Sequence, residues 1–166
     1  MQLEKTISQY ESELRKCRDV FQKKTKDYGT SWRVLRPSSL TDQLFIKAQR
    51  IRTIEENKAQ KVEEGVESEF IGLVNYAIIG LIQLKMNDNT NLDLSEHEAL
   101  THFDAESKAI QELMLAKNHD YGEAWRDMRV SSFTDLILMK LLRIRQIEDN
   151  QGKTIISEGI DAGYQD

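Results

Sequence analysis

Apolar residues recur every three or four positions along most of the chain, which is the spacing of amphipathic α-helices. Near the start they are Leu3, Ile7, Tyr10, Leu14, Cys17 and Phe21. This stripe predicts a helix that ends before the Asp-Tyr-Gly corner at 27–29, where a glycine favours a left-handed helix end. The same spacing predicts helices at about 39–57, 62–86, 95–118 and 132–150, and another that begins near Ile155. No segment alternates as a strand would, so we expect an all-α fold.

The polar positions repeat as well. Shifting the chain by 93 residues aligns 24–57 with 117–150, and 18 of these 34 aligned residues are identical. The apolar positions have drifted by exchanges that a core tolerates, such as Leu40 to Phe133, whereas most of the retained residues are polar. A solvated face has no reason to stay unchanged after a duplication. We therefore expect the retained side chains to contact either each other or a ligand.

We expect two tandem three-helix repeats, residues 1–86 and 95–166, joined by the polar linker 87–94. Each half is small for independent folding, so the two repeats should share one core in a single domain. The symmetry fails in the last helix, because the second repeat stops at Asp166 where the first continues through 73–84. An incomplete helix would expose an apolar seam, so we expect a further segment to complete it.

Composition and charge narrow the range of partners. The net charge of −5 and the pI near 5.3 disfavour a nucleic-acid polymer, because phosphate backbones recruit surplus lysine and arginine. The chain starts without a signal-peptide stretch, and its most apolar run, 71–84, is interrupted by Asn75 and Gln83. We therefore expect a cytoplasmic protein with no membrane span. Cys17 aligns with Ile110, which indicates a core residue, and the three histidines lack the spacing of zinc ligands.

Charged residues interrupt the apolar stripes of the predicted helices 39–57 and 132–150. In equivalent pairs they are Lys47 and Lys140, Glu55 and Glu148, and, on the flank, Arg50 and Arg143. A charge inside an apolar stripe is costly unless it is paired or faces a ligand. Two interpretations fit this pattern: an intramolecular ion-pair network that sets the register of the helices, and a charged pocket that holds phosphate.

Acidic residues gather at the start of the third helix of each repeat. They are Glu64 and Glu67 in the first repeat, and Glu158, Asp161 and Asp166 in the second. Carboxylates three residues apart can surround a hard cation such as Mg²⁺ and leave positions for phosphate oxygens. The same residues also suit a solvated helix start, where the helix dipole favours negative charge.

The corner Asp-Tyr-Gly-x-x-Trp-Arg-x-x-Arg occurs in both repeats at the same spacing. With the lysine that precedes it, its basic and aromatic positions are Lys24, Tyr28, Trp32, Arg33 and Arg36, and Lys117, Tyr121, Trp125, Arg126 and Arg129. The aromatic pair either anchors the loop on the core or stacks on a base, in which case the arginines meet phosphate. These residues and the lysines and arginines of the charged stripes are our candidate substrate-binding residues.

The motifs Lys-x-x-Asp-Tyr-Gly-x-x-Trp-Arg, Lys-x-x-Arg-Ile-Arg-x-Ile-Glu, Glu-Gly and Asn-Tyr-Ala resemble those of a bacterial and phage family, nucleotide modification associated domain, type one. The resemblance covers essentially both repeats. It implies a position near the MazG-type all-α pyrophosphohydrolases, which cleave (d)NTPs to a nucleoside monophosphate and pyrophosphate with Mg²⁺ held by ExxE and ExxD motifs. The implied fold is a MazG-like helical bundle with an incomplete last helix.

The resemblance also implies site residues. The five acidic residues above would hold Mg²⁺, and the lysines and arginines of the charged stripes would face phosphates. The chain departs from the family pattern at Gly72, where this kind of helix presents an aspartate, and neither repeat has ExxE followed closely by ExxD. Either one site is degenerate or both repeats build a composite site.

We therefore expect a Mg²⁺-dependent nucleoside triphosphate pyrophosphohydrolase in which Glu55 or Glu148 orients or deprotonates the attacking water. One alternative is a non-catalytic module that binds nucleotides or is associated with their modification, which Gly72 favours. Another is a helical assembly protein that joins a further subunit. A homodimer is compatible with each hypothesis, although a tandem duplication can also replace a dimer.

Overall fold

The structure is a computed structural model that describes residues 2–57 and 65–166. Its helices are α1 (Gln2–Tyr28), η1 (Ser31–Val34), α2 (Pro37–Asn57), α3 (Gly65–Lys85), α4 (Glu96–Tyr121), η2 (Ala124–Asp127), α5 (Val130–Asp149) and α6 (Ile160–Gln165), where η1 and η2 are short 3₁₀ helices. The described ranges contain no strand. The predicted all-α class is therefore confirmed.

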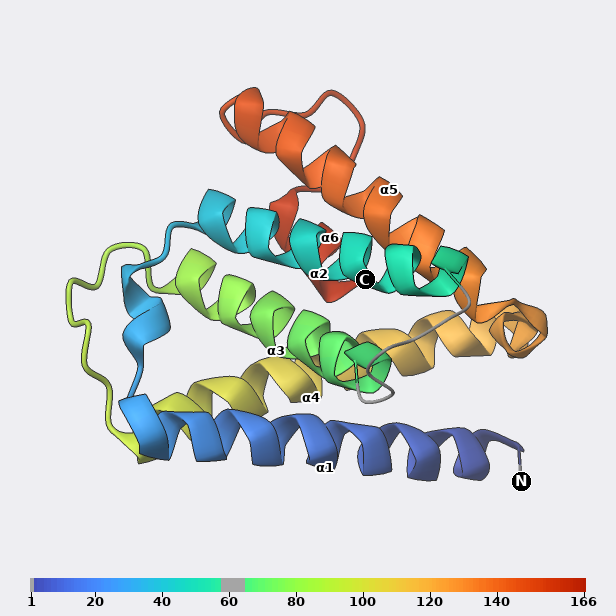
Figure 1. Cartoon of the computed structure of the whole chain (residues 1–166), viewed down its shortest axis with the longest axis horizontal. Helices are drawn as coiled ribbons and strands as arrows, with labels where there is room; N and C mark the ends of the chain where they lie inside the picture. Colours follow the sequence, from blue (N-terminus) through green and yellow to red (C-terminus); the bar gives the residue numbers. More distant parts are fainter. Residues whose placement is uncertain (1, 58–64) are drawn as a thin grey trace.

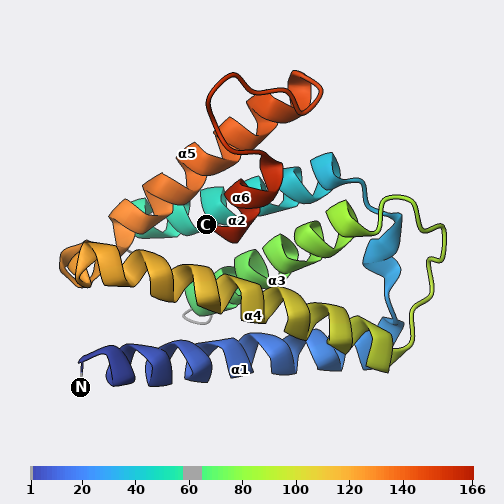
Figure 2. The same cartoon turned by 180° about the vertical axis from the view of Figure 1, so that it is seen from behind.

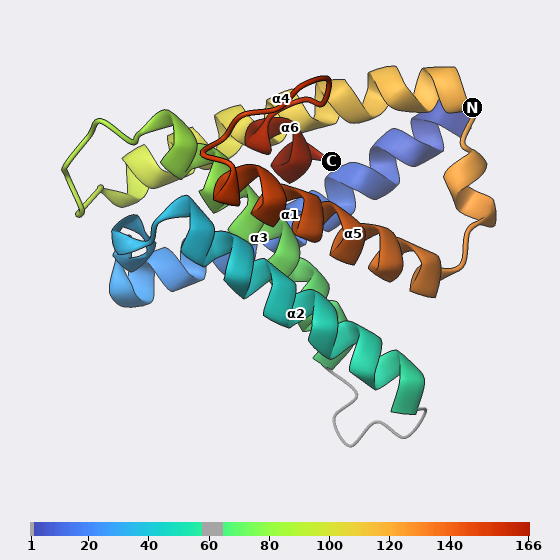
Figure 3. The ribbon, with the colours of Figure 1, turned by 90° about the horizontal axis from the view of Figure 1, so that it is seen from above.

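Helix α3 lies at the centre of the bundle (Figure 1). It packs against α1, α2, α4 and α6, while α5 packs on α2 and α6. Helices α1 and α4 run side by side along the base in Figure 1 and in the reverse view of Figure 2. Seen from above in Figure 3, α2 and α5 lie next to each other on the outer side, with the short α6 beside α5. Elements of the second half thus cover part of the surface of α3.

Several helix ends follow their sequence signals. Ser95 caps α4, because its Oγ accepts a hydrogen bond from the backbone N–H of Glu98 at 3.1 Å. Gly29 follows α1 with φ +65°, and Gly122 follows α4 with φ +57°. Both glycines take the left-handed conformation that ends a helix at little steric cost.

Other predicted boundaries are wrong. Helix α2 begins at Pro37, ahead of the predicted start, because proline is pre-organised for the first helical turn. Helix α6 begins only at Ile160, and Ile155 and Ile156 lie fully or almost fully exposed in the loop before it. The predicted start of the third helix, at about residue 62, lies outside the described residues.

The two halves share their hydrophobic core. One cluster joins α1 to α4 and contains Phe21 and Phe103. A second cluster joins α2, α3, α5 and α6 and contains Leu73 and Tyr164. The predicted burial of Cys17 is confirmed, and this burial raises the pKa of its thiol to about 11. The core therefore runs through both repeats.

Helix α3 is long and apolar enough to cross a membrane by length and composition, with a mean hydropathy of 1.4 over its most apolar window. It is instead surrounded by four helices of the bundle, and 44% of that window is buried inside the protein. A helix that is apolar on most of its circumference needs such cover. Helix α3 thus packs as the central helix of the bundle.

Helices α2 and α5 pack with a local two-fold symmetry. Arg52 lies 3.9 Å from Asp135, and Arg145 lies 3.9 Å from Asp42. Because Asp42 corresponds to Asp135 and Arg52 to Arg145, each helix offers the other the same pair of groups. These exposed ion pairs contribute little stability. They explain why four polar residues are identical in the two repeats, since these side chains contact each other.

The short helix α6 is seated tightly against α2 and α3 through Tyr164. Its buried hydroxyl donates to the carbonyl of Pro37 at 3.0 Å and lies 2.6 Å from Thr41 Oγ1. Its ring covers Gly80 of α3 so closely that a Cβ atom at residue 80 would lie 2.8 Å from a ring carbon. Glycine at this position therefore permits the close approach of the two helices.

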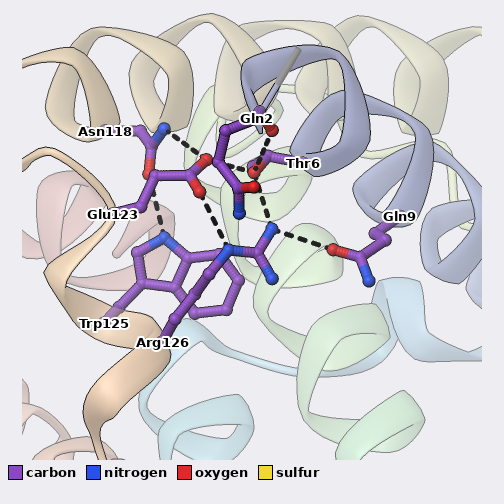
Figure 4. Close-up of polar contacts among 7 residues, drawn as sticks. All are labelled: Gln2, Thr6, Gln9, Asn118, Glu123, Trp125 and Arg126. Atoms are coloured by element: carbon purple, nitrogen blue, oxygen red, sulfur yellow. Dashed lines mark hydrogen bonds and ion pairs between the residues drawn. The ribbon is translucent and has the colours of Figure 1, made fainter.

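A polar network ties the second repeat to the first turns of α1 (Figure 4). Glu123 accepts hydrogen bonds from Thr6 Oγ1, from Asn118 Nδ2 at 3.1 Å and from Arg126 Nε at 2.8 Å. Arg126 also donates to Thr6 and to Gln9, at 2.7 and 2.9 Å. Glu123 has φ +65°, which is unfavourable for a residue other than glycine. The hydrogen bonds from Thr6 and then Arg126 hold the pKa of its carboxyl at about 2.

Replacing Gly80 with alanine should lower the free energy of unfolding by about 1–3 kcal/mol, because the added methyl group meets the buried ring of Tyr164. Gly72→Ala is the matched control on the same helix. Its methyl group meets only the flexible side chain of Lys47, and alanine gains up to about 1 kcal/mol in helix propensity. Urea unfolding followed by circular dichroism compares the two. Equal stability of both variants would contradict the packing of α6 on α3.

Glu123→Gln tests the network at α1. The folded-state pKa of about 2 lies below the ordinary value of 4.5, so the ionised carboxylate stabilises the fold above pH 4.5 and this contribution disappears as the pH falls towards 2. The variant should melt below the wild type at pH 7, and the difference should shrink between pH 4.5 and 2. Thermal melts across this range measure it, with the exposed Glu112→Gln as control. A difference independent of pH would show that the charge of Glu123 is not what stabilises the corner.

Candidate functional site

A pocket of about 580 Å³, here called the first-repeat pocket, is lined by α1, the corner around η1, Lys47 of α2, and α3. All of its lining residues lie between Val20 and Ile79. Candidate residues that the sequence places far apart meet in it: Lys24, Tyr28, Trp32, Lys47 and Glu67. The volume lies within the range of about 300–1,000 Å³ typical of small-molecule sites.

The lysines give the pocket local positive charge. Lys16, Lys23 and Lys26 of α1 form ion pairs, whereas Lys24 forms none within residues 2–57 and 65–166. Lys47 Nζ lies 3.6 Å from a carboxylate oxygen of Glu69 and 5.4 Å from the centre of the Tyr76 ring.

Glu69 interacts with two basic residues, Lys47 and Arg50, so it neutralises Lys47 only in part. The same carboxylate accepts a hydrogen bond of 2.6 Å from Arg50, outside the pocket lining. Arg50 therefore belongs to an ion-pair network, as the first interpretation of the charged stripe expects, and phosphate binding by the stripe stays a prediction. Lys47 faces both this network and the pocket.

Gly72 of α3 lies directly beneath Lys47. A Cβ atom at residue 72 would lie 3.1 Å from Lys47 Cδ and Cε, and 3.3 Å from Nζ. The lysine side chain can lie across α3 because this position carries no side chain. The residue that departs from the family pattern thus leaves a positively charged group over the pocket floor.

Asn75 provides a polar group in the same pocket that the other site residues leave without a partner. Its side chain is more than nine-tenths buried, and its Nδ2 donates to the carbonyl of Cys17 at 3.0 Å. Its Oδ1 is buried and accepts no hydrogen bond in the described part of the chain. Buried acceptors almost always have a partner. Because Asn75 lines the pocket, a ligand with an N–H or O–H group that displaced the atoms covering Oδ1 would supply one.

The aromatic residues of the first-repeat pocket differ in exposure. Tyr28 lies at the surface and is 57% exposed, whereas Trp32 is buried and packs on Phe21 with the ring centres 6.3 Å apart. Trp32 therefore anchors the corner on the core while one face borders the pocket. Tyr76 of α3 lines the pocket as well. Tyr28 and Tyr76 are the rings available to a bound base.

Arg33 has a different role from the predicted phosphate contact. It is buried, and its guanidinium donates to Gln83 Oε1 and to the carbonyls of Asn89 and Asn91, the latter two at 2.8 and 3.0 Å. It thus holds the linker between the repeats in place. Arg36 is exposed and does not line the pocket.

The predicted metal ligands are not brought together. Glu67 is an exposed residue of the pocket lining, 3.5 Å from Lys16 Nζ, and Glu64 lies outside the described residues. Glu158 is exposed in the loop before α6, and Asp161 lies on a separate hollow beside Lys85. No group of three or more potential ligands occurs among the residues that the structure describes. The described carboxylates therefore do not by themselves form the expected Mg²⁺ site.

Asp166 contacts two lysines instead of gathering with other acids. Its Oδ1 lies 2.5 Å from Lys117 Nζ, and its Oδ2 lies 2.9 Å from Lys140 Nζ. Burial opposes ionisation of this carboxyl, but the hydrogen bonds from Lys117 and Lys140 outweigh it and hold its pKa below the ordinary value. The carboxylate thus neutralises the lysines that correspond to Lys24 and Lys47.

The corner of the second repeat is built differently from that of the first. Trp125 is 39% exposed, its Nε1 donates to Asn118 Oδ1 at 2.9 Å, and the guanidinium of Arg126 lies 4.4 Å from its ring centre. Tyr121 is 73% exposed. Arg126 is held by the network of Figure 4 and is therefore not available for phosphate. Arg129 and Arg143 are exposed on the surface.

The two proposed catalytic glutamates do not line the first-repeat pocket. Glu148 accepts a hydrogen bond of 2.9 Å from Thr41 at the contact between α2 and α5. Burial raises the pKa of Glu148, and the hydrogen bond from Thr41 opposes this shift. Glu55 lies near the end of α2 and is partly buried. The structure therefore gives Glu148 a structural contact, and the catalytic role of either glutamate stays a prediction.

Sequence reasoning left two residues out of the site, Asn75 and Tyr76. A signal for them existed, because a polar residue and a tyrosine within the most apolar helix of a chain need an explanation. They lie three and four residues after Gly72, which places them on the same side of α3.

Residues 24–84 and 117–166 match the protein family described as nucleotide modification associated domain 1, in two segments that correspond to the two repeats. Searches of curated proteins and of solved structures found no match to the chain. The matched segments include the lysine, tyrosine and tryptophan positions of both corners and the part of α3 that forms the pocket floor. With more than half of its residues matched, the chain belongs to the nucleotide modification associated domain 1 family.

Proposed function

We propose that the first-repeat pocket binds a nucleotide. The observation that carries the proposal is that Lys24, which has no ion pair in the described ranges, lines one cavity together with Lys47 and with Asn75, whose buried Oδ1 has no partner. Phosphates are recognised by lysine as point charges, and a base or sugar offers the N–H or O–H group that Asn75 requires. The name of the family supports nucleotides as the ligand class.

The distribution of charge supports a small anion over a nucleic-acid polymer. The chain carries a net charge of −5, so positive potential is confined to local clusters such as the two lysines of the pocket. A polymer would need an extended basic surface along its backbone. A single nucleotide needs charge only where its phosphates lie. We place this activity in the cytoplasm, with no membrane or nucleic-acid partner, and a homodimer is compatible with it.

Mg²⁺-dependent cleavage of a (d)NTP to a nucleoside monophosphate and pyrophosphate is our second candidate function. Glu67 favours it, because this carboxylate lies on the lining of the pocket beside the lysines. The chain's own contribution would be to bind the phosphates through Lys24 and Lys47 and to orient the base. A bound metal ion would supply charge neutralisation and activate water.

Lys24→Ala should weaken nucleotide binding about tenfold or more, because it removes a phosphate partner with no competing ion pair in the described residues. Isothermal titration calorimetry with a panel of NTPs and dNTPs measures this. Lys23→Ala is the matched control, since Lys23 lies on the same helix, pairs with Asp19 at 2.7 Å and does not line the pocket. Equal losses in both variants would contradict a specific phosphate contact by Lys24.

Asn75→Leu should reduce affinity for the nucleoside part while leaving inorganic triphosphate binding unchanged. Leucine is close to asparagine in size but offers no acceptor, so the ligand's N–H or O–H group would be left unpaired, at a cost of about 1–3 kcal/mol. Competition between nucleotide and inorganic triphosphate separates the two effects. An equal loss for both ligands would show that Asn75 acts through the shape of the pocket and not as an acceptor.

Product analysis with and without Mg²⁺ tests the second candidate. If the pocket hydrolyses nucleotides, the wild type forms monophosphate and pyrophosphate only with Mg²⁺, and Glu67→Gln abolishes this while nucleotide binding remains. The exposed Glu56→Gln on α2 is the control for loss of one surface charge. Binding without product across the panel would leave the chain as a nucleotide-binding module.

A further inference from the structure

We propose that the second repeat contains a latent site for a phosphate group, and that the carboxylate of Asp166 occupies the place of the phosphate. The inference rests on the proposed function of the first-repeat pocket. It predicts that the chain binds one nucleotide and not two, although both repeats retain the two lysines.

The correspondence between the repeats identifies the three positions. Lys117 and Lys140 match Lys24 and Lys47 in the 93-residue shift. Allowing the one-residue insertion before the last helix, Asp166 matches Gly72. Both helices present this position to their lysines, because Asp166 contacts Lys117 and Lys140 while Gly72 lies beneath Lys47. At these three matched positions, the repeats differ by a single carboxylate.

The geometry of Asp166 is that of a bridging anion. Each of its two oxygens accepts from a different lysine, at 2.5 and 2.9 Å, and its side chain is only 19% exposed. A phosphate group between two ammonium groups would make the same kind of contacts. A second anion at this place would meet the negative charge of Asp166 and lysines that are already paired. The carboxylate thus competes with an external phosphate for both cations.

In the first repeat, the acidic residue near the lysines is Glu69, which lies at a different position of the helix from Asp166. Glu69 lies three residues before Gly72, so it is displaced by nearly one helical turn, and its counterpart in the second repeat is Gly163. From there it reaches Arg50 at 2.6 Å and Lys47 only at 3.6 Å. The first-repeat lysines therefore keep more of their charge for a ligand.

Space for a ligand exists beside the blocked lysines as well. Lys140 and Asp166 border a pocket of about 300 Å³ whose other walls are largely apolar and include Leu141 and Ile144. This cavity is smaller than the first-repeat pocket and has no counterpart of the exposed Tyr28, because its own tyrosines, Tyr10 and Tyr164, are half-buried and buried. We therefore assign phosphate recognition, and not base selectivity, to the latent site.

Asp166→Asn removes the negative charge with almost no change in shape, and should raise the number of bound triphosphate groups from one to two. Calorimetry with a panel of (d)NTPs and with inorganic triphosphate counts the sites. Asp161→Asn is the matched control, because Asp161 is an exposed acid of the same helix without an ion pair in the described ranges. The control should keep one site. Circular dichroism checks that each variant is folded.

Gly72→Asp is the reciprocal change and should weaken binding at the first-repeat pocket about tenfold or more, because the new carboxylate would reach the lysines. Gly72→Asn adds the same bulk without the charge and should retain most of the affinity. Equal losses for the aspartate and asparagine variants would show that bulk, and not an internal counter-ion, closes the site, and would overturn the proposal.

The remaining outcomes separate this inference from the proposed function. Two sites in the wild type, or one site in both the wild type and Asp166→Asn, would overturn the latent site and leave nucleotide binding by the first repeat intact. No binding by the wild type to any probe would overturn the proposed function. In that case a single site gained by Asp166→Asn would still support the latent site, and no gain would overturn it.

Discussion

The packing of α3 against four other helices is the constraint on which the rest of the structure depends. The helix contributes Ile78 and Ile82 to one hydrophobic cluster and Leu73 and Leu81 to the other, so its apolar surface faces more than one direction. Helices α1 and α2 cover part of this surface, and α4 and α6 cover most of the rest. One repeat alone would leave an apolar face of its third helix in water. The tandem arrangement covers that face within one chain. The floor of the first-repeat pocket is therefore part of a helix that is packed from several sides.

Contact between the two repeats explains some of their identical residues but not all of them. Asp42, Arg52 and their counterparts are retained because α2 and α5 pack with two-fold symmetry. The aspartate of each helix forms an ion pair with the arginine of the other. Lys24 and Lys47 have no such symmetric contact with their counterparts, and their surroundings differ between the repeats. A duplicated residue therefore reports on function only after its contacts with the other copy have been accounted for.

Sequence reasoning succeeded where periodicity and capping decide the outcome. Helix spacing and glycine corners predicted the fold class. The charge inside an apolar stripe drew attention to Lys47, which lines the pocket, and its contact with phosphate stays a prediction. Arg33 was assigned to phosphate because an arginine that binds the carbonyls of a buried linker has the same sequence context as one that binds a ligand. For Asp166, the spacing of acidic residues predicts a metal ligand. Its actual partners are lysines of α4 and α5, and the sequence around Asp166 does not show that these helices lie next to it. The unpaired oxygen of Asn75 becomes evident only once α1 lies beside α3.

The absence of a side chain at Gly72 has an evolutionary consequence. Codons for glycine and aspartate can differ by a single base, so the step between an accessible pair of lysines and a pair closed by an internal acid is one point mutation in either direction. Under the proposed latent site, this single change would silence or restore one of the two phosphate sites of a duplicated gene. The proposal thus makes the number of bound phosphate groups per chain a trait that a point mutation would change while the helical architecture stays constant.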